Sequence, residues 1–394
     1  MRLRTLASSI LLSFSSFSPS YAIEFFDPID GALDMGEYLA ENAYGFLPVP
    51  IVITEPAVGY GAGFTGIFLH ESDEQREKRK ALASQSLDGG AQLLTPAITA
   101  VGGFTTENGT WMGFLAHRRT WDKDSVRYLG GLGYGDINMN FYPKSTPDLL
   151  EPVADGQGVE FGMQGGGGIQ KLQFRVDDSN VFLGFSQKYY KADMQINSHR
   201  LADEIFQKLA NTSPTLSGVG LIAEYDSRNS FLNPTQGYNY TAEFLVYHDD
   251  IGSDYDFSSL SVKGINYWEL SKDWSFALKG LYKELYSNDQ FLPPTVFPDI
   301  ELRGIARNRY QGDQTLSVES QLTWQVTPRW STNVFTGIGY AASEEDSLFD
   351  QDSHYAYGMG FRYLIARRYG LKSGIDFAVS EEDSAIYFQV GAGI

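Results

Sequence analysis

The sequence predicts an all-β protein: a transmembrane antiparallel β-barrel of about 16 strands, preceded by a short N-terminal periplasmic segment. Three observations predict this fold. Segments of about ten residues alternate between apolar and polar side chains, and turn residues separate these segments. After residue 22, no apolar run approaches the roughly 18 to 20 residues of a membrane helix. A chain that crosses a membrane without helices must cross it as strands.

The first 22 residues are expected to be a cleaved signal peptide. Arg2 and Arg4 give a basic start, and residues 6–17 form an apolar stretch rich in serine. Ser20 and Ala22 are the small residues that precede a cleavage site. The apolar stretch is too short to span a bilayer as a helix. We therefore expect cleavage after Ala22 and a mature protein in the outer membrane of a Gram-negative cell.

Residues 23–57 differ in pattern from the remainder of the chain. A candidate helix covers residues 35–43, and a cluster of three prolines that ends at Pro56 indicates an extended segment after it. We expect residues 23–57 to form a periplasmic segment and residues 58–394 to form the barrel.

Alternation with a period of two is clearest in the C-terminal half. Residues 318–326 set valine, leucine and tryptophan on one face against Glu319 and Gln321 on the other. Residues 355–365 set tyrosine, methionine and phenylalanine against alanine, glycine and Arg362. A period of two sends each set to its own face of a sheet.

The contrast between the two faces distinguishes a membrane barrel from a soluble sandwich. A sandwich hides its apolar face, whereas a barrel in a bilayer turns that face outward. Tyrosine and tryptophan lie near the strand ends of the apolar faces, where interfacial girdles form, and glycines accompany charged residues on the opposite faces. The strands are also long for a sandwich. We therefore expect apolar side chains outside and polar side chains in the lumen.

Fifteen strand segments can be counted back from the C-terminus. Barrels of this kind close with an even number of strands, so one more is expected, either within 125–174 or before Gly59. Short periplasmic turns are expected at 227–236, 270–273 and 327–329, and longer extracellular loops at 192–214, 288–313 and 342–353. The fifteen segments are 384–394, 370–380, 354–365, 330–341, 314–326, 274–287, 256–268, 236–249, 215–226, 180–191, 160–174, 125–141, 110–119, 95–105 and 59–69.

Four motifs follow one another in the C-terminal half. They are the hairpin sequence DSRNSFLNPTQG (226–237), the sequence Leu302-Arg303-Gly304-Ile305, the strand sequence GMGFRY (358–363) and the terminal sequence FQVGAGI (388–394). In order and spacing they resemble the barrel of the bacterial surface antigen (Omp85) superfamily, the BamA/TamA-type assembly factors and two-partner secretion barrels. The resemblance implies a terminal assembly signal made by Phe388, Val390 and Ile394.

The chain also departs from that family's pattern. The assembly factors carry periplasmic POTRA modules, each far longer than residues 23–57, so we expect a member without POTRA modules. The family's Phe-x-Asp-x-Gly strand is present at 335–339 with Gly337 in place of the acid. Ile305 and Ile394 stand where the family has aromatic residues.

The resemblance implies a lumenal site around Arg303. The family's loop with this arginine folds into the lumen, where acidic residues on inward faces hold it. A guanidinium in a narrow lumen needs carboxylates or carbonyls for its donors, and a bidentate pair fixes its position. We expect Glu319, on the next strand, to be the first partner and Asp376 the second, with Arg362 as a further anchor of the loop.

The composition excludes several kinds of site. Without cysteine the chain has no disulfides, thiol nucleophiles or Cys-based metal sites. The 49 acidic against 30 basic residues disfavour a nucleic-acid partner. No two histidines have metal-ligand spacing, so neither a metal nor another cofactor is expected. The acidic run 344–352 could bind calcium, although a solvated loop explains it more simply.

Together, pattern and resemblance predict a non-enzymatic outer-membrane barrel with a role in envelope biogenesis or in transport across or into the outer membrane. Its expected partners are outer-membrane lipids and lipopolysaccharide, the assembly machinery during its own biogenesis, and a periplasmic or client protein. Two alternatives stay open. One is a diffusion channel for small solutes, with Lys279, Arg362 and Lys372 setting selectivity. The other is a surface lipase using His117 and a nearby serine, or a structural surface antigen.

Overall fold

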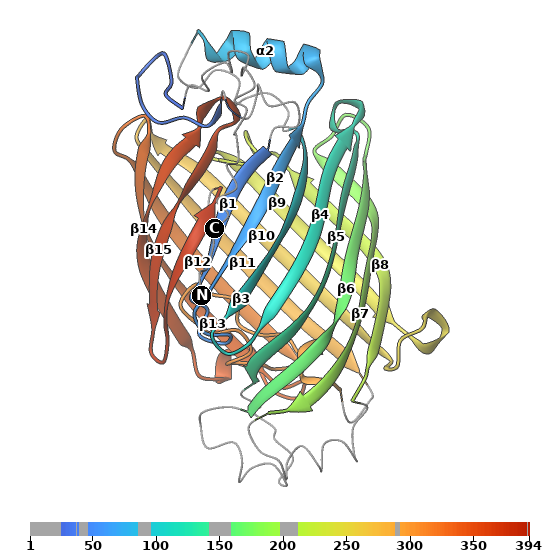
Figure 1. Ribbon diagram of the computed structural model, residues 1–394. Helices are drawn as coiled ribbons and strands as arrows, with labels where there is room; N and C mark the ends of the chain where they lie inside the picture. Colours follow the sequence, from blue (N-terminus) through green and yellow to red (C-terminus); the bar gives the residue numbers. More distant parts are fainter. Residues whose placement is uncertain are drawn as a thin grey trace, which may run out of the picture.

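Sixteen strands form one sheet, in which each strand pairs antiparallel with its neighbours in the sequence. This computed structural model describes residues 25–36, 38, 46–85, 96–141, 159–197, 212–287, 292–391 and 393–394. The sheet curls into a barrel that brings its first and last strands together (Figure 1). The predicted all-β antiparallel barrel of sixteen strands is therefore confirmed. The expected signal peptide and its cleavage site at Ala22 lie outside the described residues, as does most of the candidate helix 35–43.

Each of the fifteen predicted segments overlaps one of the strands β2 to β16. The strands are β1 (Phe46–Ile53), β2 (Gly61–His70), β3 (Ala97–Thr106), β4 (Trp111–Trp121), β5 (Val126–Phe141), β6 (Val159–Arg175), β7 (Val181–Ile196), β8 (Thr215–Asp226), β9 (Gly237–Tyr247), β10 (Phe257–Ser271), β11 (Trp274–Ser287), β12 (Gln314–Gln325), β13 (Trp330–Ala342), β14 (His354–Ala366), β15 (Leu371–Ser380) and β16 (Ser384–Val390). Helix α2 (Asp73–Ala83) follows β2, and the 3-10 turn η6 (Arg367–Tyr369) joins β14 to β15.

Strand β1 corrects the expected start of the barrel. The assignment of residues 23–57 to a periplasmic segment, with the barrel from residue 58, is wrong at 46–53, because these residues pair with β2 along their whole length. Pro48 and Pro50 explain the error, since proline is rare inside central strands. In the described chain no strand ladder joins the other edge of β1 to β16. An edge of this kind tolerates prolines, whose missing N–H groups face away from the paired strand.

The exposure of side chains confirms the inverted arrangement of the two faces. Glu319 and Asp376 point into the lumen and are only 2% and 0% exposed, whereas Met359 on the outer face is 61% exposed. Outward aromatic rings gather near strand ends, in the position of an interfacial girdle. Examples are the stacked pair Trp274 and Trp324, with ring centroids 5.7 Å apart, and the pair Trp330 and Tyr363 at 4.8 Å.

The connections divide between the two ends of the barrel. We call the end that carries the predicted periplasmic turns 227–236, 270–273 and 327–329 the turn end, and the opposite end, with 288–313 and 342–353, the loop end. The connection from β2 to β3 is long although it belongs to the turn end, and its helix α2 lies across that end (Figure 1).

Helix α2 is fastened to the barrel at the turn end. Ser72 caps its first turn in a reciprocal capping box with Gln75. Arg79 is 3% exposed, its Nε lies 2.6 Å from a carboxylate oxygen of Glu71, and its guanidinium lies over the ring of Tyr369. Among the described residues, no helix combines the length and the apolarity that a membrane crossing requires.

A buried arginine binds the chain before β1 to the same end. Arg329, between β12 and β13, has Nη2 2.9 Å from Asp27, Nε 2.6 Å from Asp30 and Nη1 2.5 Å from Asp34. Arg367 forms a second ion pair with Asp27. The hydrogen bond from Arg329 lowers the pKa of Asp30 below its ordinary value of 3.8. Three aspartates therefore neutralise two buried arginines across the turn end.

We predict that Arg329→Ala releases residues 25–36 from the barrel. The substitution leaves buried carboxylates without their shared partner, a loss of about 3–5 kcal/mol for a buried ion pair. Hydrogen exchange measured on the refolded protein should show faster exchange in this segment and unchanged protection of the strands. Arg119→Ala, at an exposed arginine near the same end, is the control. Equal exchange in the two variants would contradict the assigned role of Arg329.

Candidate functional site

Arg303, in the connection between β11 and β12, is held inside the barrel by side chains of three strands, β12, β13 and β15. Its Nε and Nη2 donate to the Glu319 carboxylate at 3.2 and 3.0 Å, and its Nη1 donates to Asp376 at 2.7 Å. Nη2 also donates to Gln321 at 3.0 Å. The guanidinium carbon lies 3.6 Å from the centroid of the Phe335 ring. The structure therefore brings Arg303, Glu319 and Asp376 together.

Arg362 contacts the acid rather than the loop. From β14 its two terminal nitrogens donate to the two carboxylate oxygens of Asp376, each at 2.7 Å. Asp376 is fully buried, and a buried carboxylate is stable only when it is paired and hydrogen-bonded. Arg362 and Arg303 thus share one carboxylate, and Arg362 positions it.

The neighbours of Arg303 fix the loop by shape. Leu302 and Ile305 are 6% and 3% exposed and lie in one apolar cluster. Gly304 has φ of +99°, and a Cβ there would lie 3.1 Å from the Val379 nitrogen, so only glycine fits. A Cβ at Gly337 would lie 2.6 Å from Leu302 Cδ2. The missing acid at 337 leaves the space that Leu302 fills, and the carboxylates come from β12 and β15 instead.

The same loop binds β16 and the turn before it. The Gly304 N–H donates to the Tyr387 hydroxyl at 3.0 Å, and the Ala306 N–H donates to Asp383 at 3.0 Å. Arg309 Nε lies 2.7 Å from the same carboxylate. This side of the barrel closure is therefore held by one hydroxyl and one carboxylate.

The loop also binds the turn after β1. The Arg307 N–H donates to Glu55 at 3.0 Å, and burial raises the pKa of Glu55. The Arg307 guanidinium lies 3.2 Å from Asp299 and 3.1 Å from Glu301. Burial would raise the pKa of Glu301, but Arg307 and Lys283 outweigh it and lower that pKa to about 2. These ion pairs stiffen the part of the loop that reaches β1.

Direct contact between β1 and β16 is slight by comparison. The Thr54 hydroxyl accepts a hydrogen bond from the Ile386 N–H at 2.7 Å and donates one to the Ile386 carbonyl. We call the line between the two strands the seam. Sequence reasoning missed Glu55, Asp383 and Tyr387, because only closure of the barrel brings these positions beside the loop. No local pattern marks them.

The three residues of the expected assembly signal do not lie together. Phe388 and Val390 pair with Ile375 and Ser373 within the last hairpin. Ile394 packs instead against an apolar cluster of β10 and β11. Gly391 and Gly393, with φ of +98° and +79°, allow the chain to turn away from the wall after β16.

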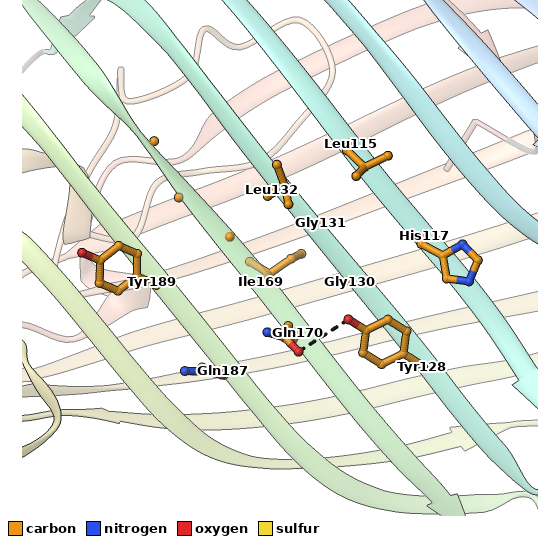
Figure 2. A pocket seen from close by; sticks show the side chains of 13 residues that line it. Leu115, His117, Tyr128, Gly130, Gly131, Leu132, Ile169, Gln170, Gln187 and Tyr189 are labelled. Atoms are coloured by element: carbon orange, nitrogen blue, oxygen red, sulfur yellow. Dashed lines mark hydrogen bonds between the residues drawn. The ribbon is translucent and has the colours of Figure 1, made fainter.

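His117 lies on the outer wall, in a hollow of about 460 Å³ over β4 to β7 (Figure 2). Its Nδ1 is 2.8 Å from the Thr99 hydroxyl, which is also 2.8 Å from His70 Nε2. Glycines form the base of the hollow, and no serine of the described chain lines it. His117 therefore has a hydroxyl neighbour, but not the serine that the lipase alternative requires.

The remaining candidates are spread over the barrel. Of the three residues suggested for selectivity, Arg362 binds Asp376 and Lys372 donates to Gln325 at 3.0 Å. Lys279, the third, forms no ion pair or side-chain hydrogen bond within the described chain. Within that part of the chain, His248, Asp249 and Asp250 are close enough to share a metal ion, and all three are exposed. The acidic run 344–352 is not part of this group.

We predict that Arg303→Ala lowers the free energy of unfolding by about 3–5 kcal/mol, because a buried charge pair loses one member. Glu319→Gln in the same protein should restore part of that loss, since it removes a carboxylate left without its partner. A double-mutant cycle of urea unfolding in detergent measures the coupling, which we expect at about 0.5–3 kcal/mol. Strictly additive effects would mean that Arg303 and Glu319 do not interact.

Comparisons with known proteins agree with this geometry. A family model described as the Omp85 superfamily domain matches residues 119–296. The structure of BamA from Haemophilus ducreyi lacking POTRA domains 1–3 is similar with a TM-score of 0.52 and 13% identity, over 87% of this chain and 68% of that one. CdiB from Escherichia coli is similar with a TM-score of 0.53 and 11% identity, over 87% of this chain and 61% of that one.

CdiB from Acinetobacter baumannii gives a TM-score of 0.52 and 9% identity, over 88% of this chain and 59% of that one. The chain therefore spans about three fifths of the two CdiB chains. No curated protein matches the sequence. At these identities the structural likeness shows the fold alone, and the family model gives the likeness of residues 119–296. The chain is an outer-membrane β-barrel whose residues 119–296 match the Omp85 superfamily domain.

Proposed function

We propose that this barrel acts in envelope biogenesis, by passing a client protein into or across the outer membrane through its seam. One observation carries the proposal. The seam has no strand ladder in the described chain, and the loop around Arg303 holds both of its sides. A seam closed by side chains can open without breaking a row of backbone hydrogen bonds.

The seam also presents an edge that suits a client strand. An unpaired strand edge offers its N–H and C=O groups to another chain, which can add to it as a further strand. The prolines at 48 and 50 remove two donors from β1, so its free edge binds weakly. Weak pairing favours release of a client over permanent capture. No catalytic step is part of this proposal.

The turn end would face the periplasm in this proposal. Helix α2 and the residues bound by Arg329 then lie where a client or a periplasmic partner arrives. Clients and partners remain proteins in this view, and the outer-membrane lipids and lipopolysaccharide surround the barrel.

A lock on the seam tests the proposal. Thr54→Cys with Ile386→Cys places two thiols where a hydroxyl now bonds the facing backbone, in a chain without native cysteine. Proteoliposomes of the full chain should speed the folding of a small unfolded outer-membrane barrel over protein-free liposomes. Oxidation of the pair should remove the gain in folding rate, and reductant should restore it.

The matched control is Ser320→Cys with Thr336→Cys, at facing positions of the continuous hairpin β12–β13. Oxidation there should leave the client's folding rate unchanged. If the oxidised seam pair still accelerates folding, the seam is not the route of the client. If the parent protein gives no acceleration, the insertion role itself is wrong.

The diffusion-channel alternative rests on the lumenal lysine Lys279, and conductance separates it from the proposal. In planar bilayers we expect the parent to be nearly silent, because the loop held by Arg303 occupies part of the lumen. Arg303→Ala should give flickering current as the loop loosens. Steady, sizeable conductance of the parent would favour a channel instead.

A further inference from the structure

Charged side chains gather on two parts of the lumenal wall. On β12 and β15 carboxylates hold Arg303. On the part of the wall from β6 to β11, four lysines have inward positions. Lys171 on β6 and Lys188 on β7 form ion pairs with Glu243 on the nearby strand β9. Residues 263 and 279 alternate with outward positions on their strands. The inward lysines are Lys171, Lys188, Lys263 and Lys279, and we call this set the lysine wall.

Glu243 neutralises only part of the lysine wall. The Lys171 and Lys188 ammonium groups lie 2.8 and 2.7 Å from its two carboxylate oxygens, and the Ser186 hydroxyl donates to it at 2.7 Å. Glu243 is 5% exposed, so these three neighbours occupy the positions at which its carboxylate accepts hydrogen bonds. Two ammonium groups against one carboxylate leave one positive charge at this end of the wall.

Lys263 and Lys279 add two further charges. Lys263 faces Leu281 across β10 and β11, which makes Lys279 its diagonal neighbour and places the two long side chains within reach of each other. Neither has a carboxylate within 4.0 Å in the described chain. Most of the charged groups that act on Lys263 are positive. They are Lys279, Arg228 and Lys171, whereas the one negative group among them is Glu224.

The acids that could serve these lysines are engaged elsewhere. Glu319 faces Lys279 in the β11–β12 register, but its carboxylate binds Arg303. The loop acids Asp299 and Glu301 bind Lys283, four residues nearer the loop end. In a chain with 49 acidic and 30 basic residues, this gathering of lysines does not follow from composition.

Like charges in a confined space repel one another, and a bound anion relieves that repulsion. The lysine wall with Glu243 carries three net positive charges, more than a single carboxylate neutralises. Lysine binds phosphate as a point charge, without the planar geometry that favours arginine for carboxylates. We propose that the lysine wall is a binding site for a phosphate group, either free or carried by a lipid headgroup. The site is separate from the seam and does not depend on its opening.

Equilibrium dialysis tests the site on the refolded full chain in a zwitterionic detergent, with radiolabelled inorganic phosphate at constant ionic strength. Lys263→Gln with Lys279→Gln should weaken phosphate binding by about tenfold or more, because two charged hydrogen bonds are lost. Lys123→Gln with Lys272→Gln makes the same change of charge at exposed turn positions and should bind as the parent does. Heat-modifiable gel migration confirms folding of each variant.

A second arm identifies the source of the phosphate. The parent and both variants are reconstituted in phosphatidylcholine vesicles with or without phosphatidylglycerol, and the phosphatidylglycerol retained after extraction is measured by mass spectrometry. Phosphate binding without lipid retention assigns a free anion, and lipid retention lost in the lysine-wall variant assigns a headgroup. The single Lys279→Gln variant should lose less phosphate binding than the double variant. It serves as the test variant if the double variant does not fold. Absence of both ligands from the parent, or equal binding by all variants, overturns the proposal.

Discussion

A bilayer offers no water to the backbone, so each N–H and C=O in the membrane must find a partner within the protein. In the described chain, antiparallel ladders meet that demand at fifteen of the sixteen junctions of this barrel. At the sixteenth junction, between β1 and β16, they do not. The barrel therefore depends on a closure that side chains make, and the site is built around this requirement.

The loop around Arg303 supplies that closure from inside. Arg303 fastens it to β12 and β15, and its backbone N–H groups then bind the turns on each side of the seam. The fastening is buried, where charge pairs are strong only when each member is compensated. Removal of Arg303 therefore affects more than one contact, because the seam bonds depend on where the loop lies.

Much of the fold could be predicted from the sequence, since strands with one face in lipid must alternate with a period of two. That alternation already put Glu319 and Asp376 on inward faces, where the structure has them. The alternation did not predict β1, because Pro48 and Pro50 are unfavourable in a strand unless their nitrogen atoms face an unpaired edge. The partners Glu55 and Asp383 could not be predicted, because the loop that they bind lies far away in the sequence. The separation is about 250 residues for Glu55 and about 75 residues for Asp383, and no local pattern reports on such a distance.

The attachment of the chain before β1 has a consequence for the order of folding. Asp27, Asp30 and Asp34 precede every strand, yet their partners Arg329 and Arg367 lie after β12 and β14. Contacts between such distant parts of a chain carry a large loop-closure entropy and form slowly. Residues 25–36 must therefore wait until nearly the whole barrel has been delivered to the membrane. The ion pairs at the turn end can therefore form only after the last hairpins have folded.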